Sequence, residues 1–530
     1  MNRNVEQWQV RKRAVSSERG IVAAQNWMSA AAGADALSRG GNAVDAAIAC
    51  AFALNAVEPW MCGMGGSGYI VIWLANERRA VAIDFQGTLP DAIDTADYPL
   101  DSSVPNAIMG FPGVSGNANV VGYKSISVPG AVAGLSAAAL AHGRLGFDSL
   151  LSPAIQLAER GLPVDWFATL QIGLEAGELT RFPASSAVYL PGGAPAQPEQ
   201  FLNLGNLGAS LRMLADEGPD AFYKGAIATA MAADLQEGGS RITVEDFAAY
   251  RPQVLTPLVH DHRGATLYTP SETSGGQRLG EALNFVTEHL DLSRPFGAHS
   301  YEIYAKALNQ AFHNHDRRLG RLPETGSTSH MSAVDAEGNM VALTYTLLNR
   351  FGSKVVLPSS GVLMNNAVSY FDPRPGYPTS MAGGKRINAS NMCPMVCVRD
   401  DEAIFAVGAS GANQIVPCTM QVAAFMLDYG MSLEEAFNTP RIDAGGRASI
   451  RVDPAVGEEV LAALERSFNL EVAQNLVFPK LYSCPSGVFR DPASGHTQGC
   501  GDKANPVAGA IAEQPFHLEE NVSGRVSARA

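Results

Sequence analysis

Charge is scarce in this sequence of 530 residues, and no long apolar run interrupts it. Charged side chains make up 17% of the chain, and 52 acidic residues against 38 basic ones give a net charge of −14. This balance argues against a nucleic-acid partner, which a basic patch would attract. No run of 18 apolar residues offers a membrane span, and the basic N-terminal stretch has no apolar segment behind it. We therefore expect no membrane partner and a cytoplasmic protein.

Cysteine and histidine give no sign of a disulfide framework or a metal site. The seven cysteines are odd in number, scattered and mostly flanked by apolar residues, which predicts buried thiols. His313 and His315 would face different sides of a helix, and His260 and His262 have no Glu-bearing metal motif around them. We expect no metal and no cofactor.

Small apolar residues and glycine dominate the first part of the chain. The segment SAAAGADALSRGGNAVDAAIACAFALNAVEP predicts two helices, broken at Gly40-Gly41, with Asn42 capping the second. The glycine loop CGMGGSG follows, and then come two short strands, YIVIWL and RAVAIDFQG. The loop lacks the Lys-Ser/Thr of a phosphate-binding P-loop and follows a helix rather than a strand. We interpret it as a tight helix-to-strand connection.

The remaining pattern predicts one α/β body with a change of character near residue 325. Helices are expected over 125–160, 205–250, 300–318 and 413–428, and strands over 265–269, 395–398 and 403–408. The run SHMSAVDAEGNMVALTYTLL contains two alternating segments around a turn at Asp335–Gly338, which predicts a β-hairpin.

One strand-to-helix segment has two interpretations. Gly408-Ala409-Ser410-Gly411-Ala412 fits the G-x-S-x-G elbow of serine hydrolases only in part, because its fifth residue is alanine. Its backbone N–H groups would suit an oxyanion hole at a helix N-terminus. The alternative is an ordinary loop, and composition does not separate the two.

The segment Gly326-Ser327-Thr328-Ser329-His330 also has two interpretations. In most proteins it would be a solvated loop with a helix or strand cap. Alternatively, Thr328 becomes a chain terminus after its Oγ attacks the Ser327 carbonyl. A terminal threonine supplies the nucleophile through Oγ and the base through its α-amine, whose pKa is about 7.7.

Taken together, these segments resemble the γ-glutamyltranspeptidase family of N-terminal-nucleophile hydrolases over nearly the whole chain. The motifs that carry the resemblance include GGNAVDAAIACAFALNAVEP, AIDFQGTLP, SVPGAVAGL, GPDAFYKG, TSHMSAVDAEGNMVALTYTL, SGVLMNN, FDPRPG, GASGANQI and DYGMSLEEAFNTPRI. The resemblance implies an α/β four-layer αββα sandwich made as a precursor. The precursor would cut itself into an intertwined large subunit, residues 1–327, and small subunit, residues 328–530. The resemblance also allows a dimer of these heterodimers.

The resemblance also implies the catalytic residues. Matching the T-x-H-x-S-x-V-D motif onto TSHMSAVD makes Thr328 the nucleophile and Ser327–Thr328 the cleaved bond. Thr346 would hydrogen-bond the nucleophile, and the loop holding Gly411 and Ala412, where the family shows Gly-Gly, would form the oxyanion hole.

The implied substrate pocket departs from the family. The arginine that pairs the α-carboxylate of a γ-glutamyl group is replaced by Gln86, and the acid that holds its α-ammonium by Tyr370. A neutral amide cannot replace a guanidinium's bidentate, charge-assisted bonds. The other predicted substrate-binding positions, which include the family's asparagine and paired-serine positions or their neighbours, are Asn349, Asn366, Ser390 and Asn391. Arg374 in FDPRPG is either a replacement cation or a structural turn residue, and the second is the favoured interpretation.

We therefore expect a self-processing amide hydrolase whose acyl group is not γ-glutamyl. Charged hydrogen bonds contribute about 1.5–3 kcal/mol each, so losing two would weaken binding of an amino-acid head group roughly 10²–10⁴-fold. Such a protein resembles the acylase and amidohydrolase branch of the family, which includes cephalosporin acylases and oxamate amidohydrolase. Two alternatives stay open: a genuine glutathione hydrolase or γ-glutamyltransferase, and a catalytically silent member that acts as a binding protein.

Overall fold

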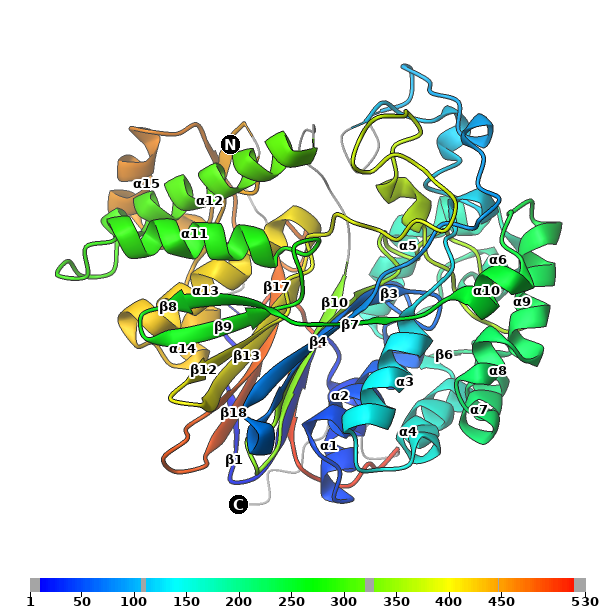
Figure 1. The fold of residues 1–530 in the computed structure, drawn as a ribbon, viewed down its shortest axis with the longest axis horizontal. Helices are drawn as coiled ribbons and strands as arrows, with labels where there is room; N and C mark the ends of the chain where they lie inside the picture. Colours follow the sequence, from blue (N-terminus) through cyan, green and yellow to red (C-terminus); the bar gives the residue numbers. More distant parts are fainter. Residues whose placement is uncertain (1–9, 106–110, 320–327, 447, 519–530) are drawn as a thin grey trace.

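Two seven-stranded sheets form the centre of the computed structural model, which describes residues 10–105, 111–319, 328–446 and 448–518 (Figure 1). Every pairing within these two sheets is antiparallel. The first, here called the β13 sheet, has the order β1 (Val15–Ser17), β18 (Thr497–Gly501), β17 (Cys484–Arg490), β13 (Glu402–Ser410), β12 (Met395–Arg399), β9 (Ala265–Thr269) and β8 (Leu258–His262). The second, the β10 sheet, has the order β19 (Gly509–Ala512), β2 (Ile21–Ala24), β10 (Ser329–Val334), β11 (Met340–Thr346), β3 (Ser67–Leu74), β4 (Arg79–Phe85) and β7 (Gln253–Leu255).

Helices cover the outer face of each sheet, so the fold has four layers (Figure 1). The β10 sheet is covered by α1 (Trp27–Ser38), α2 (Ala43–Val57) and α3 (Ala131–His142), and α4 (Phe147–Arg160) packs on the outside of α2. The β13 sheet is covered by α11 (Gly276–His289), α13 (Ile415–Tyr429) and α14 (Leu433–Asn438), while α12 (Ala298–Leu319) packs on α11 and α15 (Glu458–Glu465) on α12. Three buried clusters fill the spaces between the layers. This arrangement confirms the predicted αββα sandwich.

Further helices and two small sheets complete the fold. Beyond α4 lie the helices α5 (Trp166–Leu179), α6 (Pro183–Tyr189), α7 (Leu207–Glu217), α8 (Asp220–Tyr223), α9 (Ala226–Glu237) and α10 (Val244–Ala249). The small sheets are β5 (Leu162–Pro163) with β6 (Phe201–Leu202), and β14 (Ile442–Asp443), β15 (Ile450–Val452) and β16 (Leu470–Val472). Within the described residues, no helix combines the length and the hydropathy that a bilayer crossing requires. All seven cysteines are buried and unbridged, as expected.

Local sequence explains the layer beneath the candidate site. The Asn42 side chain accepts hydrogen bonds from the backbone N–H groups of Val44 and Asp45, and Asp45 bonds back to the Asn42 N–H, which completes a capping box at the start of α2. The β10–β11 hairpin turns where Asp335 Oδ1 accepts the Asn339 N–H at 3.0 Å and Gly338 adopts φ +86°. Strands β3, β10 and β11 are buried on both faces, and β3 accordingly carries the apolar run YIVIWL, whereas β10 buries Ser329, His330 and Ser332 with hydrogen-bond partners.

Candidate active site

Four polar residues lie side by side at one end of four neighbouring strands of the β10 sheet, namely β10, β11, β3 and β4. The register pairs Ser329 with Tyr345 and Thr346 with Ser67, so Thr328 lies opposite Thr346 one step beyond β10. In the same way, Gln86 lies opposite Ser67 one step beyond the Gly68–Phe85 pair. We call Thr328, Thr346, Ser67 and Gln86 the strand-end row. The Ser67 hydroxyl donates to Gln86 Oε1 at 3.3 Å, which joins two of its members.

Strand alternation fixes the face to which this row belongs. The Tyr345 hydroxyl donates to the Ala51 carbonyl on α2 at 2.5 Å, so Tyr345 faces the helices. Neighbouring side chains along a strand point to opposite faces, which directs Thr346 toward the β13 sheet. Thr328 and Thr346 are both buried, at 4% and 1% exposure. Thr346 Oγ1 also accepts the Leu348 N–H at 2.7 Å. The predicted partners therefore occupy facing positions, whereas Ser327 lies outside the described residues.

The glycine loop between α2 and β3 packs directly against Thr346. A Cβ atom on Gly66 would lie 2.5 Å from the Thr346 carbonyl oxygen, a separation that real Cβ atoms do not show. The Gly66 carbonyl in turn accepts the N–H groups of Gly130 and Ala131 at the start of α3. The loop joins α2 to β3, as predicted, and its glycine permits the close approach to β11.

The second predicted element, the oxyanion loop, leaves β13 in a left-handed conformation. Gly411 has φ +131° and Ala412 has φ +53°, directly after Ser410. A left-handed alanine costs roughly 1–2 kcal/mol, so the surrounding structure must hold it in place. The Ser483 hydroxyl donates to the Ser410 carbonyl at 2.5 Å, and Gln414 Nε2 donates to the Leu481 carbonyl at 2.8 Å. Both bonds tie the loop to the segment that leads into β17.

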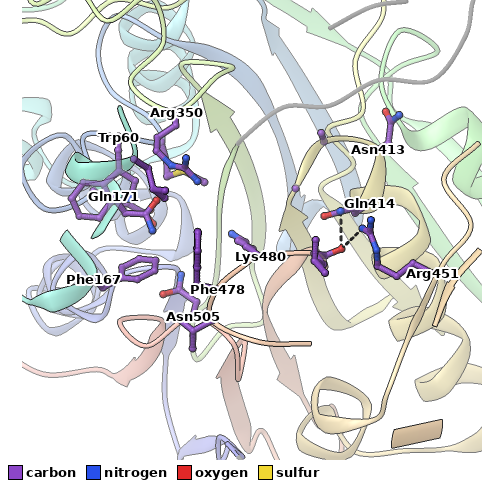
Figure 2. Close-up of a pocket in the computed structure, with 17 residues that line it drawn as sticks. Trp60, Phe167, Gln171, Arg350, Asn413, Gln414, Arg451, Phe478, Lys480 and Asn505 are labelled. Carbon is purple, nitrogen blue, oxygen red and sulfur yellow. Dashed lines mark hydrogen bonds between the residues drawn. The ribbon is translucent and has the colours of Figure 1, made fainter. Parts of the chain in front are cut away.

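A cavity of about 370 Å³ opens beside this loop (Figure 2). Its lining includes Gly411 and Ala412, aromatic side chains and four charged groups: Trp60, Phe167, Phe478, Glu58, Arg350, Arg451 and Lys480. Figure 2 shows Lys480 between the group containing Trp60 and Phe167 and the group containing Gln414 and Arg451. The cavity therefore meets the candidate oxyanion loop on one side and an aromatic wall on the other.

The cations of this cavity differ in what they contact. Arg451 pairs with Glu471 at 3.0 Å, and Arg350 pairs with Glu175 at 3.3 Å. Lys480 Nζ donates to Ser410 Oγ at 3.3 Å. Across the parts of the chain that the structure describes, Lys480 has no carboxylate within 4 Å. Of these three cations, Lys480 is therefore the one whose charge is not balanced by an adjacent carboxylate among the described residues.

Sequence reasoning missed Glu58, a buried carboxyl at the end of α2. It is 1% exposed, and its Oε2 accepts a hydrogen bond from the Ser329 hydroxyl at 2.6 Å. Burial raises the pKa of Glu58 to about 7, although the Ser329 hydrogen bond and the Lys480 charge both act to lower it. The only available signal was a single carboxylate at the end of the uncharged run from Ala46 to Val57.

His330, the histidine of the TSHMS segment, is a structural residue. Its Nδ1 lies 2.7 Å from Thr344 Oγ1 and its Nε2 lies 2.9 Å from Ser332 Oγ. Complete burial lowers the pKa of His330 to about 3, so the ring is neutral at pH 7. Its two hydroxyl partners occupy both ring nitrogens, which leaves neither available as a base for Thr328.

Gln86 is fully buried, and its backbone forms hydrogen bonds with neighbouring side chains. Its backbone N–H donates to Asp84 Oδ1 at 2.8 Å, and its carbonyl accepts from Tyr250 and Arg386 at 2.9 Å each. Arg386 also bonds the Tyr250 hydroxyl and lies 3.6 Å from Asp84. This guanidinium is therefore engaged beside Gln86. Among the described residues, Gln86 Nε2 has no hydrogen-bond partner.

The other predicted substrate-binding residues form two clusters. Asn366 Oδ1 accepts the Asn349 N–H at 3.0 Å, and Tyr370 lies in the short 3₁₀ turn that follows Asn366. Asn391 Nδ2 donates to Asn413 Oδ1 at 2.7 Å, while the Ser390 carbonyl and Asn391 Oδ1 both accept from buried Arg278. None of the predicted substrate-binding residues, Gln86 included, lines the 370 Å³ cavity. Asn413 does line it, and its bond to Asn391 connects the cavity to the second cluster.

Arg374 forms a bidentate ion pair with the side chain two residues before it. Its Nη2 lies 2.8 Å from Asp372 Oδ2 and its Nε donates to Asp372 Oδ1 at 3.0 Å. The guanidinium also stacks over the Tyr377 ring, 4.4 Å from the centroid. These contacts match a structural turn residue, the favoured of its two interpretations.

We next compared this fold and sequence with those of known proteins. A solved cephalosporin acylase from Bacillus halodurans has the same fold, with a TM-score of 0.82 at 23% identity over 97% of this chain and 99% of that one. The family described as Gamma-glutamyltranspeptidase matches residues 29–322 and 320–506. The chain belongs to this family of N-terminal-nucleophile hydrolases.

Two curated relatives are similar over most of their length. The Acylase ACY 1 proenzyme of Pseudomonas sp. (strain SE83) is 34% identical over 492 residues, which cover 86% of this chain and 87% of the relative. The Glutathione hydrolase proenzyme of Escherichia coli (strain K12) is 31% identical over 506 residues, 85% of each. Both names describe proenzymes, one of an acylase and the other of a glutathione hydrolase.

Proposed function

We propose that this protein is a self-processing amide hydrolase that uses Thr328 as an N-terminal nucleophile on an acyl group other than γ-glutamyl. The strand-end row carries the proposal, because it aligns Thr328 with Thr346 and ends in an uncharged Gln86. The proenzyme names of both relatives support the processing step, and the acylase relative supports the choice of substrate class.

The first reaction is the cleavage that creates the nucleophile. Thr328 Oγ attacks the Ser327 carbonyl, the Ser327–Thr328 amide shifts to an ester, and water hydrolyses that ester. The products are fragments of 327 and 203 residues, and Thr328 gains a free α-amine. Each central sheet contains strands from both fragments, hydrogen-bonded side by side, so we expect the fragments to remain associated.

The second reaction is amide hydrolysis. Thr328 Oγ attacks the substrate carbonyl and its proton passes to the α-amine. The N–H groups of Gly411 and Ala412 stabilise the oxyanion, and Thr346 orients the nucleophile. The protonated amine then gives its proton to the leaving amine, and water releases the acid from the acyl-enzyme.

The character of Gln86 supports an acyl group without an amino-acid head. A buried amide offers one neutral NH2 group where a guanidinium would offer a charged fork. The nearby Arg386 is engaged by Gln86, Tyr250 and Asp84, so it does not supply the missing cation. The donor at Gln86 Nε2 suits a substrate whose acyl group presents a neutral acceptor oxygen.

A panel of p-nitroanilides separates this proposal from a glutathione hydrolase, which the Escherichia coli relative favours as the second candidate. We expect kcat/KM for γ-glutamyl p-nitroanilide to lie about 10²–10⁴-fold below that of an uncharged acyl anilide of similar length, because two charged contacts are missing. Release of p-nitroaniline measures each rate. Faster turnover of the γ-glutamyl compound would instead establish the second candidate.

Replacing Gln86 tests its role in substrate binding. In Gln86→Met the volume is nearly kept while the amide donor is lost, so we expect kcat/KM for the best panel substrate to fall about 10-fold. Self-processing, followed by mass, should proceed as in the parent protein because the scissile bond does not need this donor. An unchanged kcat/KM would remove Gln86 from the binding site.

A further inference from the structure

Glu58 has no step in the mechanism above, yet it is fixed beside the nucleophile. Its Oε2 is 2.6 Å from the hydroxyl of Ser329, the residue that follows Thr328. Successive Cα atoms are only about 3.8 Å apart, so the carboxyl lies close to the α-amine that cleavage would create. Its position at the end of α2, packed beneath β10, leaves it nearly inaccessible to solvent.

Among the described residues, four titratable groups have charges that interact with Glu58: Cys50, Cys62, Tyr345 and Lys480. Burial raises the pKa of Cys50 on α2 to about 12 and raises the pKa values of Cys62 and Tyr345 well above their usual range. Lys480 is the cation whose charge acts on Glu58. Lys480 also contacts Ser410, directly before the oxyanion loop. Arg350 and Arg451 line the same cavity, but each pairs with a glutamate, so Glu58 and Lys480 are the charges that matter most beside the nucleophile.

We propose that Glu58 is the counter-ion of the Thr328 α-ammonium and that Glu58 and Lys480, acting in opposite directions, control when that amine is free to accept a proton. Both are positioning residues, since neither transfers a proton to substrate. The inference rests on the proposed function, because the amine exists only after cleavage before Thr328.

The sign of each effect follows from charge. In the uncut chain burial raises the pKa of Glu58 to about 7, and a new cation beside it favours the ionised carboxylate. An ionised Glu58 in turn raises the pKa of the α-amine above its usual 7.7–8.0, whereas Lys480 lowers it. Thr328 Oγ reacts only when the amine is neutral, so reactivity rises with pH through the α-amine pKa.

Labelling with phenylmethanesulfonyl fluoride measures this dependence without knowledge of the substrate. Thr328 Oγ forms a bond to sulfur, fluoride leaves, and the hydroxyl proton passes to the α-amine. The mass of the smaller fragment reports the rate at each pH. In a plot of labelling rate against pH, the midpoint of the rise gives the α-amine pKa. For Glu58→Gln we expect this midpoint to move down by about one pH unit, and for Lys480→Met we expect it to move up by a similar amount.

A matched control is Asp335→Asn, which neutralises a buried carboxyl at the far end of β10. The midpoint of its labelling rate against pH should coincide with that of the parent protein. Opposite shifts in Glu58→Gln and Lys480→Met support the inference, because loss of packing alone would not change sign. If Glu58→Gln does not accumulate as folded protein, the upward shift in Lys480→Met, with Asp335→Asn unmoved, still supports it.

Two results overturn the inference and are distinguishable from each other. If the parent protein and both variants are cleaved but label with the same pH dependence, Glu58 and Lys480 have no such role, while the proposed function stands. A parent protein that stays uncut would overturn both, because there would be no α-amine for Glu58 to face.

Discussion

Thr328→Ala is expected to remain one chain of 530 residues and to lose at least about 10³-fold in kcat on any anilide that the parent protein hydrolyses. The variant lacks the Oγ that both proposed reactions use, so processing and turnover fail together. The change removes one hydroxyl and one methyl group at a strand end, so we expect the fold to survive. Mass spectrometry and p-nitroaniline release measure the two effects.

Thr328→Ser is the matched control for this result. It keeps Oγ and the α-amine and removes only the methyl group, so we expect two fragments and measurable hydrolysis. Processing of Thr328→Ala at the normal rate would assign the cleavage to another group. Retained turnover by an uncut Thr328→Ala chain would place the nucleophile elsewhere.

The second large effect is expected at the oxyanion loop, where Gly411→Ala should lower kcat about 10²–10³-fold. Gly411 has φ +131°, a region that residues with a Cβ rarely adopt, and the added Cβ would lie 3.0 Å from Ser483 Cα. Relief of this strain moves the backbone N–H groups of Gly411 and Ala412 away from the oxyanion. The processing rate and kcat both report the change.

Ala412→Gly is the opposite substitution in the same loop and serves as its control. Ala412 has φ +53°, which glycine adopts without steric cost, so we expect kcat to change less than about 3-fold. Thermal unfolding of both variants separates strain in the loop from loss of the fold. If Gly411→Ala had full activity, this loop would not stabilise the oxyanion.

Local patterns were enough to predict much of the fold. The helices α1 and α2 follow from small apolar residues at helical spacing and from the Asn42 cap. The β10–β11 hairpin follows from alternation around the turn at Asp335. In each case the stabilising partners lie within a few residues, so the sequence itself contains the signal.

The missed strands depend on distant partners. Strands β17 and β18 read CPSGVFR and TQGCG, and their proline and glycines disfavour strand structure by composition. They form because β17 pairs with β13 and β18 pairs with β1, near the other end of the chain. The β10–β11 hairpin was predicted, but the pairing of β10 with β2, a strand more than 300 residues earlier, was not. Such pairings leave no local signature.

The candidate site divides in the same way. Thr328, Thr346, Gly411 and Ala412 were predicted by resemblance, and the strand register then places Thr328 and Thr346 opposite each other. Glu58 carries no motif and gains its chemical meaning only from Ser329, which lies 271 residues away in the sequence. Asn391 was predicted to bind substrate, and its bond to the buried Arg278, which no motif marked, appears only in the folded chain.

The central claim is that Thr328 becomes a chain terminus, and N-terminal sequencing of the purified parent protein beside its intact mass tests it most directly. We predict two fragments of 327 and 203 residues and a first cycle that reads threonine, followed by Ser329, His330 and Met331. A single uncut chain, or a smaller fragment that starts at any other residue, would contradict the account and favour a binding protein or a different nucleophile.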